Sequence, residues 1–533
     1  MTQFGHSLTR IDQAAGKYEP AFFYLLLLIN TLPVLLFKSF PTVDGPAHLY
    51  NTRLIIDLLQ NPDSGLSDFL VFNPHLNPNL IGHVLLGVFM LFLPALIAEK
   101  IVMLVYLILF PVAFRYLFSV LRIKETWLVY FVFPFTYSFM FFYGFYNFHL
   151  GLVFFFFTLG FWIRTMQSGF SWRAGIVLTL LSLVVFFSHL FVFAMLLLTI
   201  GVINISAVSD MLPNNSARRK AAINTWLRQL LILLPGIILT IIYFVTHAPG
   251  NGVSEYTGWS EMWLMLKHVQ PAKGVDYGKE DIFTKWIFFL FVLIAGYHLI
   301  NRIRKLKMPV IRQSVAWGIL VVLLFLVLKL VPNTVGGNFG FVSSRLLVFF
   351  FLFLIVFLAT LRTPIWIRII AFVIINYVNI ALLNVYVHAT EKHSAVVEQV
   401  IAASEFIEPY STVYPIYSSN DWLFTQVSNY LGIDTPMIIT KNMEASLDYF
   451  PLKWNYEQLP NLRVSDSLND ARILYTENPD QHQQIDYVFI FSEDANNPNE
   501  TLDSYPFLNQ NYTLVYKSEN QRASLFRKKE SAN

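Results

Sequence analysis

The residues with the clearest chemical potential lie in one short stretch that follows the first apolar run of the chain. Within Pro41–Arg53 stand Asp44, His48 and Asn51. A helix begun at Pro46 would place His48 within a turn of Asp44, with Asn51 close by. A carboxylate and an imidazole at the edge of a large apolar scaffold indicate chemistry on a molecule that the lipid delivers.

The same residues also fit a purely structural role. Asp44 is of a type that often caps the first turn of a helix, and Pro46 would then lie in that turn, where its ring is tolerated. Capping does not exclude catalysis, so both interpretations stay open at this point.

The composition defines the class of protein that must position these residues. The chain is 55% hydrophobic, 17% aromatic and only 13% charged, whereas a soluble domain carries about 25% charged residues. Several charge-free runs approach the ~20 residues that cross hydrocarbon. These features predict a polytopic α-helical membrane protein. Because the chain has no cysteine, disulfides, thiol catalysis and thiolate metal sites are excluded.

The apolar segments can be placed along the chain from hydrophobicity alone. The first, 21–37, has no cleavage pattern after it and is predicted to be a retained span. The full set is 21–37, 81–98, 101–120, 126–143, 148–166, 174–188, 190–207, 229–247, 284–300, 312–331, 344–360 and 366–388.

Orientation follows from lysine and arginine, which favour cytoplasmic loops. The basic residues lie mostly in short loops between spans, so the net charge of +3 does not predict a nucleic-acid partner. Their positions are mutually consistent only if one segment does not cross, and the segment 81–98, which contains Gly82, His83 and Pro94, fits an interfacial helix. The prediction is about 11 transmembrane helices, with the amino terminus in the cytoplasm.

This topology places further polar residues on the same outer face as Asp44. Arg345 opens a late span, where its guanidinium would clamp a lipid phosphate or simply extend to the headgroups. His189 lies between two apolar runs. An outer turn contributes Tyr143, Asn147 and His149, which are candidate substrate-binding residues or members of an ordinary interfacial belt.

The predicted domains follow from the change of composition near residue 389. Residues 1–20 form a cytoplasmic amino terminus. Residues 21–388 form the transmembrane domain, with outer loops 38–100 and 248–283. Residues 389–533 form a small soluble extracytoplasmic α/β domain, in which helix-like stretches such as Val396–Phe406 alternate with the strand-like runs Ser411–Tyr417, Ile485–Ser492, Tyr512–Lys517 and Ala523–Arg527.

No spacing in the sequence resembles a two-histidine metal site, a phosphate-binding glycine loop or a nucleophile elbow. Asp44 and Asp57 are acidic residues that could help to hold a divalent cation, but they are not an Asp-x-Asp pair. We therefore expect no tightly bound metal, and at most a loosely bound divalent cation.

The arrangement of these features resembles the GT-C class of integral-membrane glycosyltransferases. Asp44 follows the first span, the stretch Asn77–His83 precedes an apolar helix, Tyr143–His149 forms an outer turn, and Arg345 opens a late span before a soluble domain. The stretches Asn429–Pro436 and Tyr449–Asn455 look like those of uncharacterised bacterial members. One departure is that many such enzymes have two adjacent acidic residues where this chain has Asp44 and Gly45.

The resemblance implies a sugar transfer from a polyprenyl-phosphate carrier to a glycan, lipid or protein acceptor. Asp44 would act as general base, and Arg345, helped by His48 or His189, would stabilise the charge on the leaving phosphate. The expected location is a bacterial inner membrane. Two alternatives are a transporter or flippase for lipid-linked saccharides and a non-catalytic envelope assembly protein.

Overall fold

A computed structural model describes residues 18–208, 216–247, 252–303, 312–335, 340–447, 449–459, 464, 485–492 and 506–529. The predicted cytoplasmic segment 1–20 therefore lies largely outside the described residues. The chain divides into two compact units. The first comprises Met1–Pro33, Leu104–Phe141 and Asn147–Val387, and the second comprises Val34–Met103, Phe142–Tyr146 and His388–Asn533.

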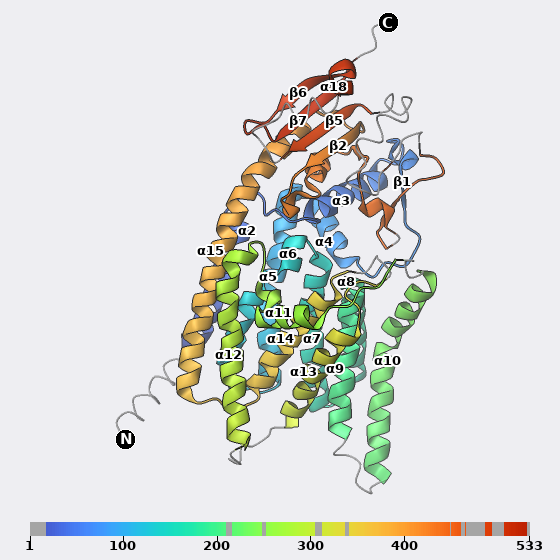
Figure 1. The fold of residues 1–533 in the computed structure, drawn as a ribbon. Helices are drawn as coiled ribbons and strands as arrows, with labels where there is room; N and C mark the ends of the chain where they lie inside the picture. Colours follow the sequence, from blue (N-terminus) through green and yellow to red (C-terminus); the bar gives the residue numbers. More distant parts are fainter. Residues whose placement is uncertain are drawn as a thin grey trace. The chain divides into compact units, whose positions relative to one another are not determined.

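The first unit is predominantly helical (Figure 1). Four of its helices also have residues in the second unit, namely the start of α5, the end of α6, the first residue of α7 and the end of α15. Its elements are α5 (Ala95–Val120), η2 (Thr126–Phe135), α6 (Phe139–Tyr143), α7 (Tyr146–Ser168), α8 (Trp172–Ser188), α9 (Leu190–Val208), α10 (Ser216–Thr246), α11 (Trp259–Lys267), η3 (Gln270–Ala272), α12 (Tyr277–Ile303), α13 (Arg312–Leu330), α14 (Val342–Ala359) and α15 (Ile365–Ala403).

Among the described residues, 8 helical segments are long and apolar enough to cross a membrane. They are Tyr18–Leu35, Ala95–Val120, Thr126–Tyr143, Tyr146–Ser168, Asn224–Thr246, Tyr277–Arg302, Val342–Ala359 and Ile365–Phe406. The shorter apolar helices are Ile81–Met90, Trp172–Ser188, Leu190–Ser206 and Ser314–Leu330. The expected apolar segments lie on these helices, except that 81–98 is divided between Ile81–Met90 and the start of Ala95–Val120. The set confirms a polytopic helical membrane protein.

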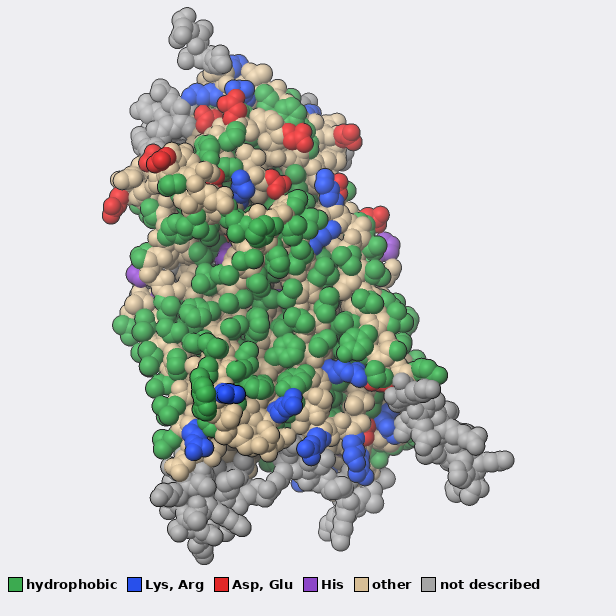
Figure 2. All heavy atoms as spheres, turned by 180° about the vertical axis from the view of Figure 1, so that it is seen from behind, with side chains coloured by type: hydrophobic (Ala, Val, Ile, Leu, Met, Phe, Trp, Pro, Cys, Tyr) green, Lys and Arg blue, Asp and Glu red, His purple; other side chains and the backbone are tan. Residues whose placement is uncertain are grey.

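The surface of the first unit is what a lipid-facing protein requires. Large apolar side chains are exposed along α10 and α12, including Leu231, Ile241, Phe289 and Val292. Figure 2 shows hydrophobic side chains over most of one face of the helical part, with lysine and arginine side chains gathered near one end of this apolar band. In hydrocarbon, exposed apolar side chains carry no free-energy penalty, whereas unpaired backbone groups carry a large one. A helix pairs its own backbone groups and therefore suits this surface.

One expected span differs in its backbone. Thr126–Phe135 is a 3₁₀-helix, followed by the short helix α6, although such runs rarely exceed three or four residues. Pro134 lacks a backbone N–H, and all side chains from Trp127 to Phe135 are buried. The segment is thus packed on all sides by protein, and tertiary packing overrides the α-helical preference of an isolated apolar run.

The second unit joins the first long loop to the carboxyl-terminal segment. A two-stranded antiparallel sheet pairs β1 (Leu70–Phe72) with β4 (Leu452–Trp454), in register from Leu70 with Trp454. The remaining elements before residue 104 and between residues 404 and 511 are α2 (Leu32–Leu35), α3 (Gly45–Gln60), η1 (Leu66–Asp68), α4 (Ile81–Met90), η4 (Ser404–Phe406), η5 (Trp422–Phe424), η6 (Val427–Gly432), η7 (Glu444–Ser446) and α18 (Pro506–Asn511).

A five-stranded mixed sheet with the order β3-β2-β5-β7-β6 forms the core of the carboxyl-terminal segment (Figure 1). The strands are β2 (Thr412–Ser418), β3 (Ile438–Ile439), β5 (Tyr487–Ser492), β6 (Tyr512–Lys517) and β7 (Ala523–Lys528). β2 pairs in parallel with β3 and β5, whereas β7 is antiparallel to β5 and β6. Each strand-like run of the sequence is a strand here, which confirms the α/β character of this part.

The helix α15 extends beyond the apolar segment 366–388 without a break and ends at Ala403. The sequence between these points has neither glycine nor proline to stop it. By contrast, α4 has 10 residues and is about 15 Å long, which is half the thickness of the hydrocarbon core. That length fits the prediction that this helix does not cross.

Candidate functional site

The helix α3 starts where the sequence predicted, with Pro46 in its first turn. The residues before it are held by backbone hydrogen bonds, in which the N–H groups of Val43 and Asp44 donate to the carbonyls of Phe142 and Tyr143 at 3.1 and 2.9 Å. The N–H of His48 donates to the carbonyl of Asp44 at 2.9 Å. One turn of helix therefore brings the two side chains to the same site.

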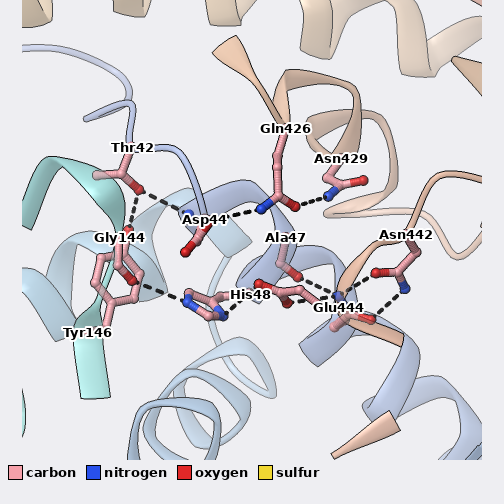
Figure 3. Close-up of polar contacts among 12 residues, drawn as sticks. Thr42, Asp44, Ala47, His48, Gly144, Tyr146, Gln426, Asn429, Asn442 and Glu444 are labelled. Carbon is pink, nitrogen blue, oxygen red and sulfur yellow. Dashed lines mark hydrogen bonds and ion pairs between the residues drawn. The ribbon is translucent and has the colours of Figure 1, made fainter. Parts of the chain in front are cut away.

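Asp44 occupies the N-cap position, but its carboxylate makes no capping hydrogen bond. The hydroxyl of Thr42 accepts from the N–H of Gly45 instead, at 3.0 Å. The carboxylate of Asp44 accepts from Nε2 of Gln426 at 2.7 Å (Figure 3). Asp44 thus stands at the N-cap position that the structural interpretation gave it, but its side chain does not cap the helix and is held instead by a residue 382 positions away.

His48 lies between a backbone carbonyl and a second carboxylate. Its Nε2 lies 3.2 Å from the carbonyl oxygen of Gly144, and its Nδ1 lies 3.6 Å from Oε1 of Glu444 (Figure 3). The imidazole ring is further packed against the rings of His83 and Tyr146, at centroid distances of 4.9 and 5.5 Å. These contacts give the ring a single defined orientation.

Asn51 is completely buried and holds the second carboxylate in place. Its Nδ2 lies 3.2 Å from Oε2 of Glu444 and 3.1 Å from Oδ1 of Asn442, and its Oδ1 accepts from Nδ2 of Asn442 at 2.7 Å. The side chain of Asn51 is therefore part of the support of Glu444, and its direct contact with a substrate stays a prediction.

The electrostatics of this group follow from its burial. Burial raises the pKa of the Asp44 carboxyl from 3.8 to about 7, against the opposing effect of the hydrogen bond from Gln426. Burial, and then the charge of Asp44, raise the pKa of Glu444 well above its usual value. Burial lowers the pKa of His48 to about 4. Within the described part of the chain, neither carboxylate forms an ion pair with a lysine or arginine.

These groups are also spaced so that they could hold a metal ion. Asp44, His48 and Glu444 each offer a ligand atom, and these atoms lie within 4.8 Å of one another. Asp57 is not part of this group: it is buried further along α3, where it accepts hydrogen bonds from Asn61 and Tyr410.

A second hydrogen-bond network supports the segment before α3. Oε1 of Glu99 accepts from the hydroxyl of Tyr146 at 2.6 Å, and the same hydroxyl lies 3.0 Å from that of Thr42. Through Thr42 this network reaches the N–H of Gly45. Glu99 thereby fixes the backbone on which Asp44 is presented.

Sequence reasoning missed Gln426 and Glu444. Glu444 follows β3, a strand that runs parallel to β2. Residues beyond the carboxyl ends of parallel strands often carry ligand-binding groups, so recognition of this short strand would have drawn attention to Glu444. Gln426 lies in a loop with no such signal.

The structure divides the remaining predicted site residues between the two units. Tyr143 belongs to the second unit, where its backbone carbonyl binds the N–H of Asp44 and its ring lies 6.2 Å from that of Trp422. Asn147 and His149 belong to the first unit; both are buried, and Nε2 of His149 lies 3.2 Å from the hydroxyl of Ser138.

His189 and Arg345 also belong to the first unit. His189 ends α8, and its electrostatic neighbours are Arg345 and His149. Arg345 lies in the first turn of α14, where its Nη1 donates to the carbonyl of Gly340 at 2.7 Å. His149, His189 and Arg345 thus lie near enough to one another in this unit to interact electrostatically. Their roles stay predictions.

No protein-family model matches the chain, and no curated protein matches its sequence. Two crystal structures of ArnT from Cupriavidus metallidurans are similar in fold. The apo structure has a TM-score of 0.50 and 11% identity, over 96% of this chain and 98% of that chain. The structure bound to undecaprenyl phosphate has a TM-score of 0.53 and 10% identity, over 97% and 99%.

Both matches extend over nearly the full length of each protein, from the helical part to the carboxyl-terminal sheet. At such low identity they establish the architecture and not the chemistry. The resemblance in fold that the sequence suggested is confirmed: the chain has a GT-C-like fold, similar to that of ArnT.

Proposed function

We propose that this protein is a membrane glycosyltransferase of the cell inner membrane, which moves a sugar from a polyprenyl-phosphate carrier to an acceptor at the extracytoplasmic face. The fold supports this proposal, since one similar structure is that of ArnT bound to undecaprenyl phosphate. The observation that carries it is the carboxylate of Asp44, which is buried, makes no capping hydrogen bond and is held by Gln426.

The proposed reaction assigns Asp44 the role of general base. Its carboxylate takes the proton of an acceptor hydroxyl while the hydroxyl oxygen attacks the anomeric carbon of the sugar. The bond between that carbon and the phosphate oxygen breaks, and the polyprenyl phosphate leaves with the electron pair. Gln426 holds one oxygen of Asp44 at 2.7 Å, so the carboxylate is oriented before the acceptor arrives.

The leaving phosphate requires positive charge or hydrogen-bond donors. We assign Arg345 to this role, because a guanidinium binds a phosphate through paired hydrogen bonds. Asn147, His149 and His189 are assigned to substrate binding in the same unit as Arg345. His48, Asn51 and Tyr143 are assigned to the surroundings of Asp44.

The test is a transfer assay with inner-membrane vesicles that contain the full chain and a panel of radiolabelled sugars linked to undecaprenyl phosphate. Label should move from the carrier to another molecule only when the chain is present. Asp44→Asn should lower the initial rate by about 10²–10⁴-fold, the usual contribution of a general base. The matched control is Asp63→Asn, which changes an exposed residue outside the site and should leave the rate unchanged.

Three results would contradict the proposal. Transfer at the wild-type rate by Asp44→Asn would remove Asp44 from the chemistry. Movement of label across sealed vesicles without its release from the carrier would favour the alternative of a flippase. A third result, unchanged envelope products in cells that carry stable Asp44→Asn protein, would favour an assembly role without catalysis.

A further inference from the structure

We propose that Asp44, His48 and Glu444 form a binding site for one divalent cation of the zinc or manganese kind. Asp44 and His48 come from the start of α3, and Glu444 comes from the carboxyl-terminal segment. The site is a property of the folded protein alone and can be tested by cation binding without any assay of sugar transfer.

The hydrogen-bonding state of His48 favours a bound cation. A backbone carbonyl only accepts, so the contact of Nε2 with the carbonyl of Gly144 requires the proton on Nε2. In the neutral ring, Nδ1 then carries a lone pair. This atom is buried without a hydrogen-bond donor in the described part of the chain, and it faces the carboxylate of Glu444 at 3.6 Å. Two electron-rich atoms in that geometry call for a positive charge between them.

The buried carboxylates of Asp44 and Glu444 also favour a bound cation. The side chain of Glu444 is only 8% exposed and that of His48 only 13%. No lysine or arginine in the described ranges pairs with Glu444 or Asp44. Burying two carboxylates without a counter-ion is costly, and the pKa of each is accordingly raised by burial. A divalent cation would replace the protons that otherwise neutralise the pair.

The hydrogen-bond partners of the three proposed ligands are those expected around a metal ion. A metal-bound histidine usually donates its second N–H to a carbonyl or carboxylate, and metal-bound carboxylates accept further hydrogen bonds. Here Gly144 accepts from His48, Gln426 donates to Asp44, and Asn51 donates to Glu444. Each proposed ligand thus already has the supporting contact that orients it (Figure 3).

The ligand types select the kind of cation. One imidazole nitrogen and two carboxylate oxygens suit Zn²⁺ or Mn²⁺ better than a soft cation. Two ligands bound at about 2.1 Å to a tetrahedral ion lie roughly 3.4 Å apart, close to the 3.6 Å between His48 and Glu444. Three protein ligands leave a position for water or a hydroxyl, whose pKa a bound cation lowers.

The experiment uses the purified full chain in detergent, stripped with a chelator and titrated with Zn²⁺ alone by calorimetry. We expect one ion per chain. Glu444→Gln and His48→Gln should each weaken binding by at least about tenfold. The matched controls are Glu408→Gln and His75→Gln, which change exposed residues of the same unit and should not alter the affinity. X-ray absorption of the loaded protein should show nitrogen and oxygen neighbours at about 2.0–2.2 Å, with one imidazole.

Failure of the wild-type chain to bind Zn²⁺ or Mn²⁺ would overturn the proposal and leave a shared proton between Glu444 and His48 as the explanation. Binding that Glu444→Gln and His48→Gln leave unchanged would overturn it as well. If a variant fails to fold, as judged by gel filtration, the absorption spectrum of the loaded wild-type chain still decides whether one imidazole and carboxylate oxygens surround the ion. A transfer assay without activity would leave the binding result intact, so the two proposals can fail separately.

Discussion

Two clusters of charged side chains, one in each compact unit, use the same residue types in opposite ways. In the first unit, Asp281 forms ion pairs with three basic side chains, those of His268, Lys273 and Lys285. In the second unit, as far as its residues are described, the imidazole of His48 is the basic group that Asp44 and Glu444 share. The carboxylate of Asp281 is fully compensated by protein, whereas the pair at α3 is not.

The difference separates a structural cluster from a candidate site. Every ionic requirement of Asp281 is met inside the fold, and its neighbour Glu280 accepts backbone hydrogen bonds from Gly274, Val275 and Asp276 at 2.7–2.8 Å. Such a cluster stabilises the loop before α12. A buried carboxylate pair without compensation is retained at a cost in stability, which is typical of groups that act on a ligand.

The two clusters should differ most in their contribution to the free energy of unfolding. Asp281→Asn leaves three basic groups without their shared carboxylate and should lower the free energy of unfolding by about 2–3 kcal/mol. Glu444→Gln replaces a buried carboxyl group that lacks a basic partner by a neutral side chain of the same shape, and in chelator-treated protein it should leave the free energy of unfolding unchanged or raise it. Thermal unfolding of the two variants in the same detergent measures this contrast. Equal losses of stability would show that both clusters are structural.

A smaller effect should come from the backbone that presents Asp44 and His48. Gly144 has φ +92°, and a Cβ there would lie 2.9 Å from the backbone nitrogen of Gly45 and 3.0 Å from that of Asp44. Gly144→Ala should therefore lower the free energy of unfolding by about 2 kcal/mol. It should also lower the rate of sugar transfer by about ten- to hundredfold, because Asp44 and His48 would be displaced.

The matched control for this change is Gly65→Ala. Gly65 also has a positive φ, +82°, but nothing lies within 4 Å of its Cβ position. The Gly65→Ala variant should lose only about 1 kcal/mol of its free energy of unfolding, because of backbone strain, and its rate of sugar transfer should be unchanged. Equal losses of transfer in both variants would argue against a site at Gly144.

The smallest effect concerns Asp421, a carboxylate that His393 and the backbone N–H of Leu423 hold in place. Oδ2 of Asp421 lies 2.8 Å from Nε2 of His393. Burial alone would raise the pKa of Asp421, but the hydrogen bond and charge of His393 lower it below 3.8. Asp421→Asn should cost about 1.5 kcal/mol near neutral pH.

The sign of this pH dependence follows from the lowered pKa. The stabilisation is complete above the unfolded pKa of about 3.9 and is lost as the pH falls through the folded value. The difference in melting temperature between wild type and variant should therefore shrink below about pH 4. A difference that stays constant down to pH 3 would show that the pair does not titrate in this way.

The sequence by itself determined the elements of this protein. Apolar composition predicted the helices, because a span in hydrocarbon must satisfy its backbone internally. The start of α3 was readable from Pro46, and the strands β2, β5, β6 and β7 from their apolar runs. These are local properties, set by residues that are neighbours in the chain. They do not include the 3₁₀ conformation of Thr126–Phe135, which depends on burial from all sides.

Only the tertiary structure decided which side chains meet. Gln426 reaches Asp44 across 382 positions of sequence, and Glu444 reaches Asn51 across 393. No periodicity encodes such contacts, because they depend on how the β1–β4 pair and the packing of α3 align segments from opposite ends of the chain. The sequence has no second carboxylate next to Asp44, and the fold supplies one, that of Glu444, in this way.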